Sequence, residues 1–316
     1  MSEKTTEMRK KSFSEEQLST LPGLFVLENK GIVKISGEDA ESFLQGQLTC
    51  HMAFVTENSS HFGAICTPKG RMISIFRIFK KELDYLLIME QSVIPSFTQH
   101  ISKYIPFYKA EIEDVTSLYN IYGVSHQISE MFPEQDVEID EVRPYQNNNV
   151  IGYGPNRWLV IEPINENITK KMFSSRPIFA GSSAWNSLDI LQKIPHLTEL
   201  SVEKFLPHEV GLPQIGGVSF NKGCYTGQEI IARMEFRGSL NKHPVVLTTD
   251  KPTQLSASEP VKIQEDSKIV SIGNVINITQ MEEQPPLILA CIKDSYVEKG
   301  NFILNSENPT ILKVIN

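Results

Sequence analysis

Apolar and polar residues follow two different periods along this chain, which predicts a protein that mixes helices with strands. Runs rich in Val, Ile, Phe and Tyr are separated by helical stretches that carry apolar residues on one face. The sequence Pro68-Lys69-Gly70-Arg71 has the composition of a turn and joins two such runs into a predicted hairpin. Predicted strands cover residues 24–27, 31–35, 61–67, 72–79, 83–89, 110–115, 118–124 and 157–161, and predicted helices begin near residues 39, 92, 165 and 185.

The pattern changes near residue 242, beyond which almost every apolar run is typical of a strand. Short strands with little helix between them favour a closed sheet, so we expect a small C-terminal β-barrel. The fold class that follows is α+β, with layered α/β domains before the barrel. The predicted barrel strands are residues 244–248, 261–263, 269–278, 287–292 and 311–315.

A length of 316 residues suggests about two domains or more and a sizeable core. We expect a tail at residues 1–23, an α+β domain at 24–124, a middle α+β domain at 125–241 and the barrel at 242–316. The middle domain begins with an acidic and polar stretch, residues 125–149, that resembles a connector. The tail lacks the apolar core of a signal peptide, and no apolar run approaches the roughly 18 residues that cross a bilayer.

Charge and cysteine usage limit the classes of partner. A formal net charge of -8 argues against a large basic face, so we expect no direct contact with nucleic acid. The four cysteines form no CxxC pair and the seven histidines have no metal-ligand spacing, so neither a local metal site nor a disulfide framework is expected. A reducing compartment, the cytoplasm, fits this composition.

Cys224 is flanked by glycines and by charged and polar residues in the run Lys222-Gly223-Cys224-Tyr225-Thr226-Gly227-Gln228-Glu229. Thr226 and Glu229 have the spacing of a capping box, which predicts a helix that begins near Gly227. Cys224 would then precede a helix N-terminus, with Lys222 nearby, and both favour a thiolate. The alternative is that Cys224 is a small buried residue with no chemistry, since free cysteine is often buried.

This run, with Arg233, resembles the signature of the YgfZ family, folate-binding proteins of iron-sulfur cluster maintenance and tRNA modification. That family is related in fold to the T-protein of the glycine cleavage system, an aminomethyltransferase. Two earlier segments are also similar to family segments in the same order. They are Phe43-Leu44-Gln45-Gly46-Gln47-Leu48-Thr49 and Pro68-Lys69-Gly70-Arg71-Met72.

The resemblance implies a T-protein-like multidomain fold around a central folate cavity, with tetrahydrofolate or another folate as the cofactor. It implies that Trp185 contacts the pterin and that Cys224 acts as a reactive thiol at the cavity wall. The expected partners are folate and iron-sulfur enzymes such as radical tRNA methylthiotransferases. The expected supporting residues are Lys222, Gly223, Tyr225, Gly227, Gln228, Glu229 and Arg233. Arg233 and Arg237 lie one helical turn apart and would either meet the glutamate tail of folate or form a solvated face.

The chain departs from the related proteins at two places. A family tryptophan near the start of the chain is replaced here by Glu28-Asn29-Lys30-Gly31, and the T-protein carboxylate four residues after the position of Gly70 is replaced by Ser74. Serine cannot replace a carboxylate as a base without an activating partner. We therefore favour an accessory protein of iron-sulfur cluster synthesis or repair over the alternative, a folate-dependent aminomethyl transferase.

Overall fold

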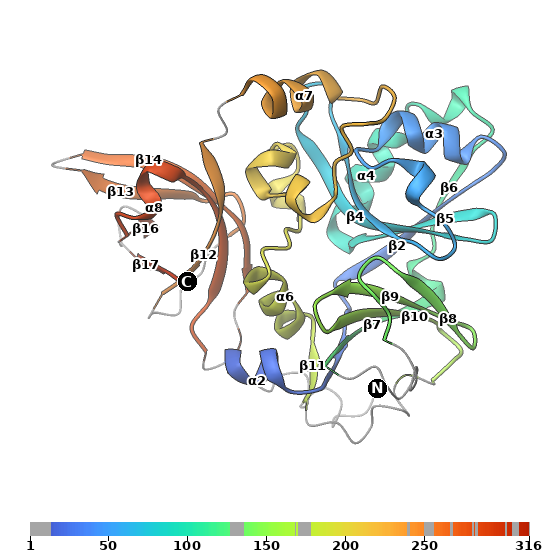
Figure 1. Cartoon of the computed structure of the whole chain (residues 1–316), viewed down its shortest axis with the longest axis horizontal. Coiled ribbons are helices and arrows are strands. Elements are labelled where there is room, and N and C mark those ends of the chain that lie inside the picture. The colour runs from blue at the N-terminus through green and yellow to red at the C-terminus, as the bar shows by residue number, and fades with distance from the viewer. Residues whose placement is uncertain are drawn as a thin grey trace.

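The computed structural model describes residues 14–126, 136–167, 169, 178–238, 241–249, 256–265, 268–279, 281, 284–300, 302–304 and 310–315. Two open sheets and one closed barrel make up its framework, and helices fill the spaces between them (Figure 1). The α+β fold class and the C-terminal barrel predicted from the sequence are both confirmed. No helix in the described part of the chain is long and apolar enough to cross a membrane.

The first sheet has five strands in the order β3-β4-β5-β2-β6. The predicted hairpin is present, with Ile65 opposite Ser74 and with Gly70 at φ 73°, the left-handed region that glycine tolerates. Two helices, α3 (Ala40–Gln47) and α4 (Ile94–Ile101), contribute buried apolar residues to the same core as this sheet. The strands are β2 (Lys30–Ser36), β3 (His61–Cys66), β4 (Met72–Lys81), β5 (Asp84–Glu90) and β6 (Glu111–Asp114).

The second sheet has six strands in the order β11-β1-β7-β10-β9-β8. This sheet combines strands from before and after residue 124, where the sequence predicted a domain boundary. The domain limits stay predictions. The interpretation of residues 125–149 as a connector was wrong for its described end, because Val142 pairs with Ile151 in a regular ladder. The strands are β1 (Gly23–Val26), β7 (Tyr119–Ser125), β8 (Val142–Tyr145), β9 (Asn148–Gly154), β10 (Arg157–Pro163) and β11 (Ile178–Gly181).

The barrel closes in the order β12-β15-β14-β13-β16-β17 and has its own apolar core, which includes Phe302 and Leu312. Closure leaves no sheet edge along the circuit, which is the physical advantage of this arrangement. The strands are β12 (Lys242–Thr248), β13 (Pro260–Glu265), β14 (Lys268–Thr279), β15 (Leu287–Lys293), β16 (Phe302–Leu304) and β17 (Thr310–Val314). The short helix α8 (Asp294–Val297) follows β15.

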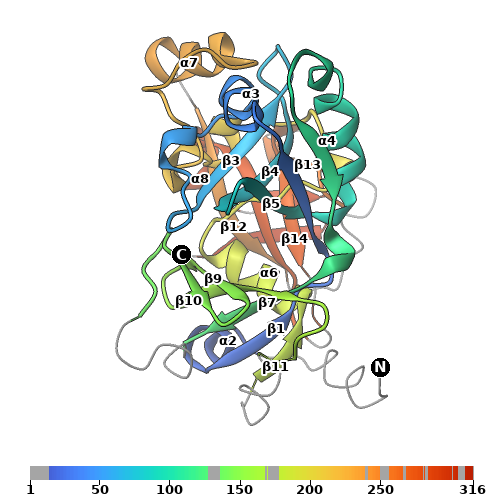
Figure 2. The same ribbon diagram turned by 90° about the vertical axis from the view of Figure 1, so that its right-hand side faces the viewer.

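Helix α6 (Ser182–Leu191) lies between the six-stranded sheet and the barrel, as both views show (Figures 1 and 2). Hydrogen bonds fix the barrel to this region: Thr279 Oγ1 donates to the Ser183 carbonyl at 2.9 Å, and His196 and Asn277 exchange two bonds at 2.8 Å. The start of the helix predicted from residue 165 was wrong, because residues 165–167 are turn and coil; residue 169 is helical, and the remaining residues of that prediction lie outside the described ones.

The remaining helices are short, apart from α7 (Gln228–Arg237). They are α2 (Glu15–Thr20) and the 3-10 turns η1 (Met52–Phe54), η2 (Gln91–Val93), η3 (Ile105–Phe107), η4 (Thr116–Leu118), η5 (Glu199–Ser201), η6 (Pro207–Val210) and η7 (Pro213–Ile215).

Candidate functional site

The loop at residues 221–227 leads directly into α7, so the helix begins where the sequence predicted. The capping box was wrong. The N-cap is Gly227, which has no side chain and sits at φ 86°, and the Thr226 hydroxyl instead donates to Gln47 Oε1 at 3.2 Å. A Cβ at Gly227 would lie 2.7 Å from the Thr67 carbonyl oxygen. Glycine is therefore required here by both its conformation and the close approach of backbone.

Lys222 holds this loop to the segment at residues 45–50. Its ammonium donates to the carbonyl oxygens of Gln45, Leu48 and Cys50 at 2.8, 2.6 and 2.8 Å. Burial lowers the pKa of Lys222 to about 8, although the nearby Cys50 opposes the shift. The Lys222 ammonium thus joins the loop at residues 221–227 to the segment at residues 45–50. It also lies 4.9 Å from the centre of the Tyr225 ring, a cation-π distance.

The segments that resemble the family in sequence meet in space. The segment at residues 43–49 meets the run at residues 222–229, because the Thr226 amide donates to the Gly46 carbonyl at 3.2 Å. Thr49 adds contacts to the residues just before that run: its hydroxyl donates to the Gly217 carbonyl at 2.6 Å, and its carbonyl accepts from the Ser219 amide at 2.9 Å. The turn at residues 68–71 completes the cluster, since a Cβ at Gly70 would lie 3.1 Å from Ile230 of α7. We call these three segments the motif cluster.

Cys224 is exposed at the surface of the motif cluster, whereas Cys50, Cys66 and Cys291 are buried. Cys224 is therefore not the buried residue of the alternative, and its reactivity stays a prediction. Burial raises the pKa of the Cys50 thiol to about 11 and that of Cys291 to about 12, and also raises the pKa of Cys66. Within the described residues a Cβ at the adjacent Gly223 would meet nothing inside 4 Å. The thiol at Cys224 stands in the most open surroundings of the four.

The exposed face of α7 carries the other charged residues of the signature. Arg233 pairs with Glu229 at 2.8 Å, and their side chains are 60% and 82% exposed. Arg237, in the last turn, is exposed too, so this pair of arginines forms a solvated face. Gln228 is the first residue of the helix and is half-buried.

Trp185 lies on α6 and is 0% exposed. The guanidinium carbon of Arg157 sits 3.8 Å from the centre of its ring, and the rings of Phe25 and Tyr153 lie 5.5 and 5.4 Å away. Among the described residues its indole Nε1 has no hydrogen-bond partner, although it is buried. Such an orphaned donor is unusual in a folded protein and requires an explanation.

A buried chain of charged side chains runs away from Trp185, and the sequence alone did not reveal it. Arg157 Nη2 lies 2.5 Å from Asp189 Oδ1, and Asp189 Oδ2 lies 2.6 Å from His196 Nε2. His196 Nδ1 is 3.1 Å from Lys30 Nζ, which lies 2.6 Å from Glu90 Oε1. We call these five residues the ionic chain.

Burial opposes the ionisation of Asp189, but Arg157 and His196 outweigh it and lower the pKa of Asp189 to about 2. Asp189 is therefore a permanent anion near neutral pH. Because Lys30 can only donate, the hydrogen bond between Lys30 and His196 assigns Nδ1 of the histidine as the acceptor and places its proton on Nε2, toward Asp189.

Two cavities meet at the ionic chain. A narrow one of about 20 Å³ lies against Trp185, Lys30, Phe62 and Arg77. A wider one of about 320 Å³ lies at the junction of β5, α6 and the barrel, and we call it the junction cavity. His196 lines both. Cys224 is not among the described residues that line either of them, so the structure does not bring Cys224 and Trp185 into one site.

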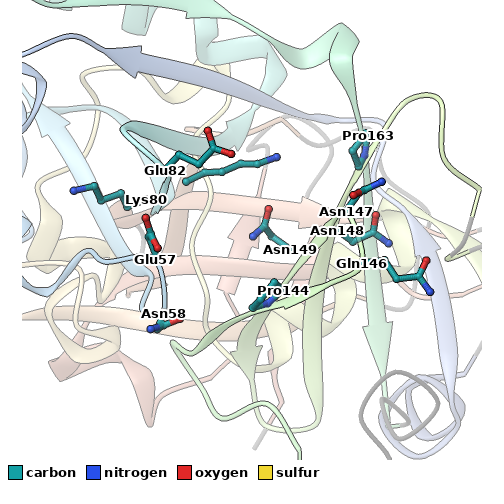
Figure 3. A pocket seen from close by; sticks show the side chains of 11 residues that line it. Glu57, Asn58, Lys80, Glu82, Pro144, Gln146, Asn147, Asn148, Asn149 and Pro163 are labelled. Atoms are coloured by element: carbon teal, nitrogen blue, oxygen red, sulfur yellow. The ribbon is translucent and has the colours of Figure 1, made fainter.

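A further open cavity of about 420 Å³ lies where the β4–β5 turn faces the β8–β9 turn (Figure 3). Lysines, glutamates and amide side chains dominate its wall, and prolines supply its apolar surface. It lacks the aromatic and apolar lining that small-molecule pockets usually have. None of the site residues predicted from the sequence is among the described residues that line it.

Two chemical possibilities can be assessed directly. In the described part of the chain, no group of three or more His, Cys, Asp or Glu side chains has the arrangement of a metal site. Ser74 is 0% exposed on β4, and its hydroxyl has no hydrogen-bond partner among the described residues. Within the described residues the Ser74 hydroxyl is therefore hydrogen-bonded to no acid or base that could activate it.

The fold matches that of a known class of enzyme. Over 95% of this chain and 87% of the other, it superimposes on the glycine cleavage system aminomethyltransferase T from Bartonella henselae, with a TM-score of 0.73 and 14% sequence identity. At that identity the likeness establishes the fold alone. The chain thus has the T-protein fold, as the sequence resemblance implied.

The sequence comparison is more specific. The chain is 33% identical over 236 residues to the tRNA-modifying protein YgfZ of Photobacterium profundum, covering 73% of this chain and 71% of that protein. It is 26% identical over 305 residues to the protein of the same name from Vibrio atlanticus, covering 95% and 93%. The chain belongs to the YgfZ family. No protein-family model matches it.

Proposed function

We propose that this protein is a folate-binding accessory factor in tRNA modification, and that it supports the synthesis or repair of iron-sulfur clusters in enzymes that methylthiolate tRNA. The observation that carries the proposal is the exposed Cys224 thiol, in a loop that contacts the other two segments of the motif cluster. Membership of a family whose curated relatives are tRNA-modifying proteins supports the tRNA role. Four free thiols suit the reducing cytoplasm.

Folate is the cofactor that the T-protein fold implies, and the residues around the junction cavity fit it. A volume of about 320 Å³ lies at the lower end of the range for small-molecule sites. Asn186 Oδ1 and Thr198 Oγ1 belong to residues of its wall, are buried, and have no partner among the described residues. Trp185, Lys30, Glu90 and His196 would hold the pterin. A reduced folate would supply a one-carbon or redox-active group there.

The alternative of a one-carbon transferase loses support at Ser74. A general acid or base commonly contributes two to four orders of magnitude in rate, and the buried Ser74 hydroxyl has no hydrogen-bond partner among the described residues that would activate it. Folate binding does not depend on that group, so it can persist without the transfer reaction.

Cys224 acts on a partner rather than on the folate. Thiolates are the usual protein ligands of iron-sulfur clusters, and an exposed thiol can reach a cluster or a cysteine on another protein. The expected partners are iron-sulfur enzymes such as radical tRNA methylthiotransferases. Contact with the tRNA itself is not part of this proposal.

Fluorescence tests the folate proposal, because the protein has only two tryptophans. Trp158 and Trp185 belong to different core clusters, and the Trp158 indole donates to the Val137 carbonyl at 2.8 Å. We expect tetrahydrofolate to change the emission of the wild type and of Trp158→Phe in a saturable manner, and to leave that of Trp185→Phe nearly unchanged. The absence of saturation in the wild type would overturn folate binding.

Alkylation and complementation test the thiol. At pH 8, iodoacetamide should label one cysteine per folded chain, and Cys224→Ser should abolish that labelling because the other three thiols are buried and their pKa values are raised. In cells that lack the protein, wild type and Cys291→Ser should restore tRNA methylthiolation, whereas Cys224→Ser should not. Full restoration by Cys224→Ser would remove the thiol from the function.

A further inference from the structure

Charged and polar side chains stand between the two cavities. Lys30 lines the narrow cavity beside Trp185, Glu90 lines the junction cavity, and His196 lines both. The side chains of Lys30 and Glu90 are only 6% and 8% exposed. A ligand that reaches Trp185 from the junction cavity must therefore meet this pair.

A buried ion pair is a poor way to stabilise a fold. Its desolvation penalty often exceeds the attraction between the charges, and apolar residues of similar volume are frequently as stable or more so. The Lys30–Glu90 pair is therefore better explained by recognition of a polar ligand than by packing.

The pair has unused hydrogen-bonding capacity. Among the described residues, Glu90 and His196 accept two of the three protons of the Lys30 ammonium, which leaves the third for a ligand. Glu90 accepts from Lys30 and from Asn29 Nδ2, and a carboxylate offers about four acceptor positions. Asn29 Oδ1 is buried and has no partner among the described residues. The pair thus offers one free donor beside several acceptor positions.

This pattern matches one edge of a pterin. The 2-amino-4-oxo ring of folate presents a carbonyl acceptor beside an N–H and an amino group that donate. We propose that the Lys30–Glu90 pair binds this edge, with Lys30 donating to the 4-oxo oxygen and Glu90 accepting from the neighbouring N–H groups. The protein therefore selects 4-oxo folates over 4-amino folates. This inference rests on the proposed folate function.

Folic acid and aminopterin provide the test, because they differ only at position 4, where an amino group replaces the oxo group and N3 consequently loses its hydrogen. A 4-amino group would place a donor against the Lys30 ammonium, and mismatched buried polar groups are costly to binding. Titration calorimetry of the full-length wild type should show a Kd for folic acid at least about tenfold lower than for aminopterin, or about 1.4 kcal/mol.

Lys30→Met should bring the two Kd values within about threefold of each other. The control is Lys34→Met on the same strand, because Lys34 pairs with Glu113 at 2.7 Å outside both cavities, and it should keep the wild-type ratio. Lys30→Met leaves Glu90 buried without its counter-ion, so the double variant Lys30→Met/Glu90→Gln is measured as well. It should likewise lose the preference for folic acid over aminopterin.

The outcomes separate the two proposals. Equal affinity of the wild type for both compounds, or an unchanged ratio in both Lys30 variants, would overturn the recognition by Lys30 and leave folate binding intact. Failure of the wild type to bind either compound would overturn the proposed function itself.

Discussion

The two residues that the family resemblance singles out, Cys224 and Trp185, are held by different kinds of interaction. The loop around Cys224 is exposed and is fixed by main-chain carbonyls, three of which accept from Lys222. Trp185 is fully buried and is fixed by side chains, with the Arg157 guanidinium 3.8 Å from its ring and the ionic chain beyond. One region presents a thiol at the surface, and the other lies in the interior of the molecule.

This difference predicts different sensitivities to mutation. Main-chain carbonyl acceptors remain in place whatever side chains surround them. The stability of the loop around Cys224 should therefore depend on its backbone conformation and on only a few side chains. The ionic chain holds four charged side chains that are almost wholly buried, so removal of one of them leaves another uncompensated. Mutations that disturb the Trp185 region should therefore cost more stability than those at the motif cluster.

The largest effect is expected at the centre of the ionic chain. Asp189→Ala leaves Arg157 buried without its counter-ion and should lower the free energy of unfolding by about 3–5 kcal/mol. Urea denaturation of the wild type and of Asp189→Ala measures this loss. The double variant Arg157→Met/Asp189→Leu, which removes both charges, should recover most of the loss. A loss below about 1 kcal/mol in Asp189→Ala would show that the ionic chain is solvated and would remove the contrast between the two regions.

A smaller loss is expected in the motif cluster, at Gly227. Alanine there must adopt a φ near 86° and bring its Cβ to 2.7 Å from the Thr67 carbonyl oxygen, so we expect a loss of about 2–3 kcal/mol. Gly223→Ala is the matched control in the same loop. It should change stability by less than about 0.5 kcal/mol, because within the described residues its Cβ would meet nothing inside 4 Å. Equal losses in the two variants would contradict the assigned loop conformation.

The same contrast explains what could be predicted from the sequence. The hairpin at residues 61–81, the barrel and the start of α7 follow from local patterns and turn residues, and all three are confirmed. The capping box failed because Gly227, in the left-handed region, occupies the N-cap and turns Thr226 toward Gln47. Spacing alone does not report that conformation.

The ionic chain could not be predicted, since its members are far apart in the sequence. Lys30 meets Glu90 across neighbouring strands, and it meets His196 at a separation of 166 residues. The one available signal was the polar run at residues 28–31, where an aromatic residue was expected. The sequence does not show that Lys30 of this run lies beside Glu90 and His196. That contact, on which the binding hypothesis rests, is seen only in the folded structure.

Lys222 allows the motif cluster to be tested by pH. Because burial lowers its pKa to about 8 from the ordinary 10.5, the unfolded chain retains a proton between these values that the folded chain releases. The stability of the wild type relative to Lys222→Met should therefore rise between pH 8 and 10.5, by about 1–2 kcal/mol once partial solvation is allowed for. Urea denaturation of both variants at pH 7.5, 9 and 10.5 measures this difference. A relative stability that falls with pH would show that the three carbonyls hold the ammonium more strongly than burial opposes it.

The smallest effect is expected at Glu229, and it decides how α7 begins. A capping box would make Glu229→Ala cost about 1 kcal/mol, because the helix would lose a reciprocal hydrogen bond at its start. In the structure Glu229 instead pairs with Arg233 at the surface, so the loss should stay below about 0.5 kcal/mol and shrink further in 1 M salt. Thr226→Val should cost more than Glu229→Ala, since it removes the bond to Gln47 that links two segments of the motif cluster. The opposite ranking in thermal denaturation would restore the capping box and would make the start of α7 independent of its contact with the segment at residues 43–49.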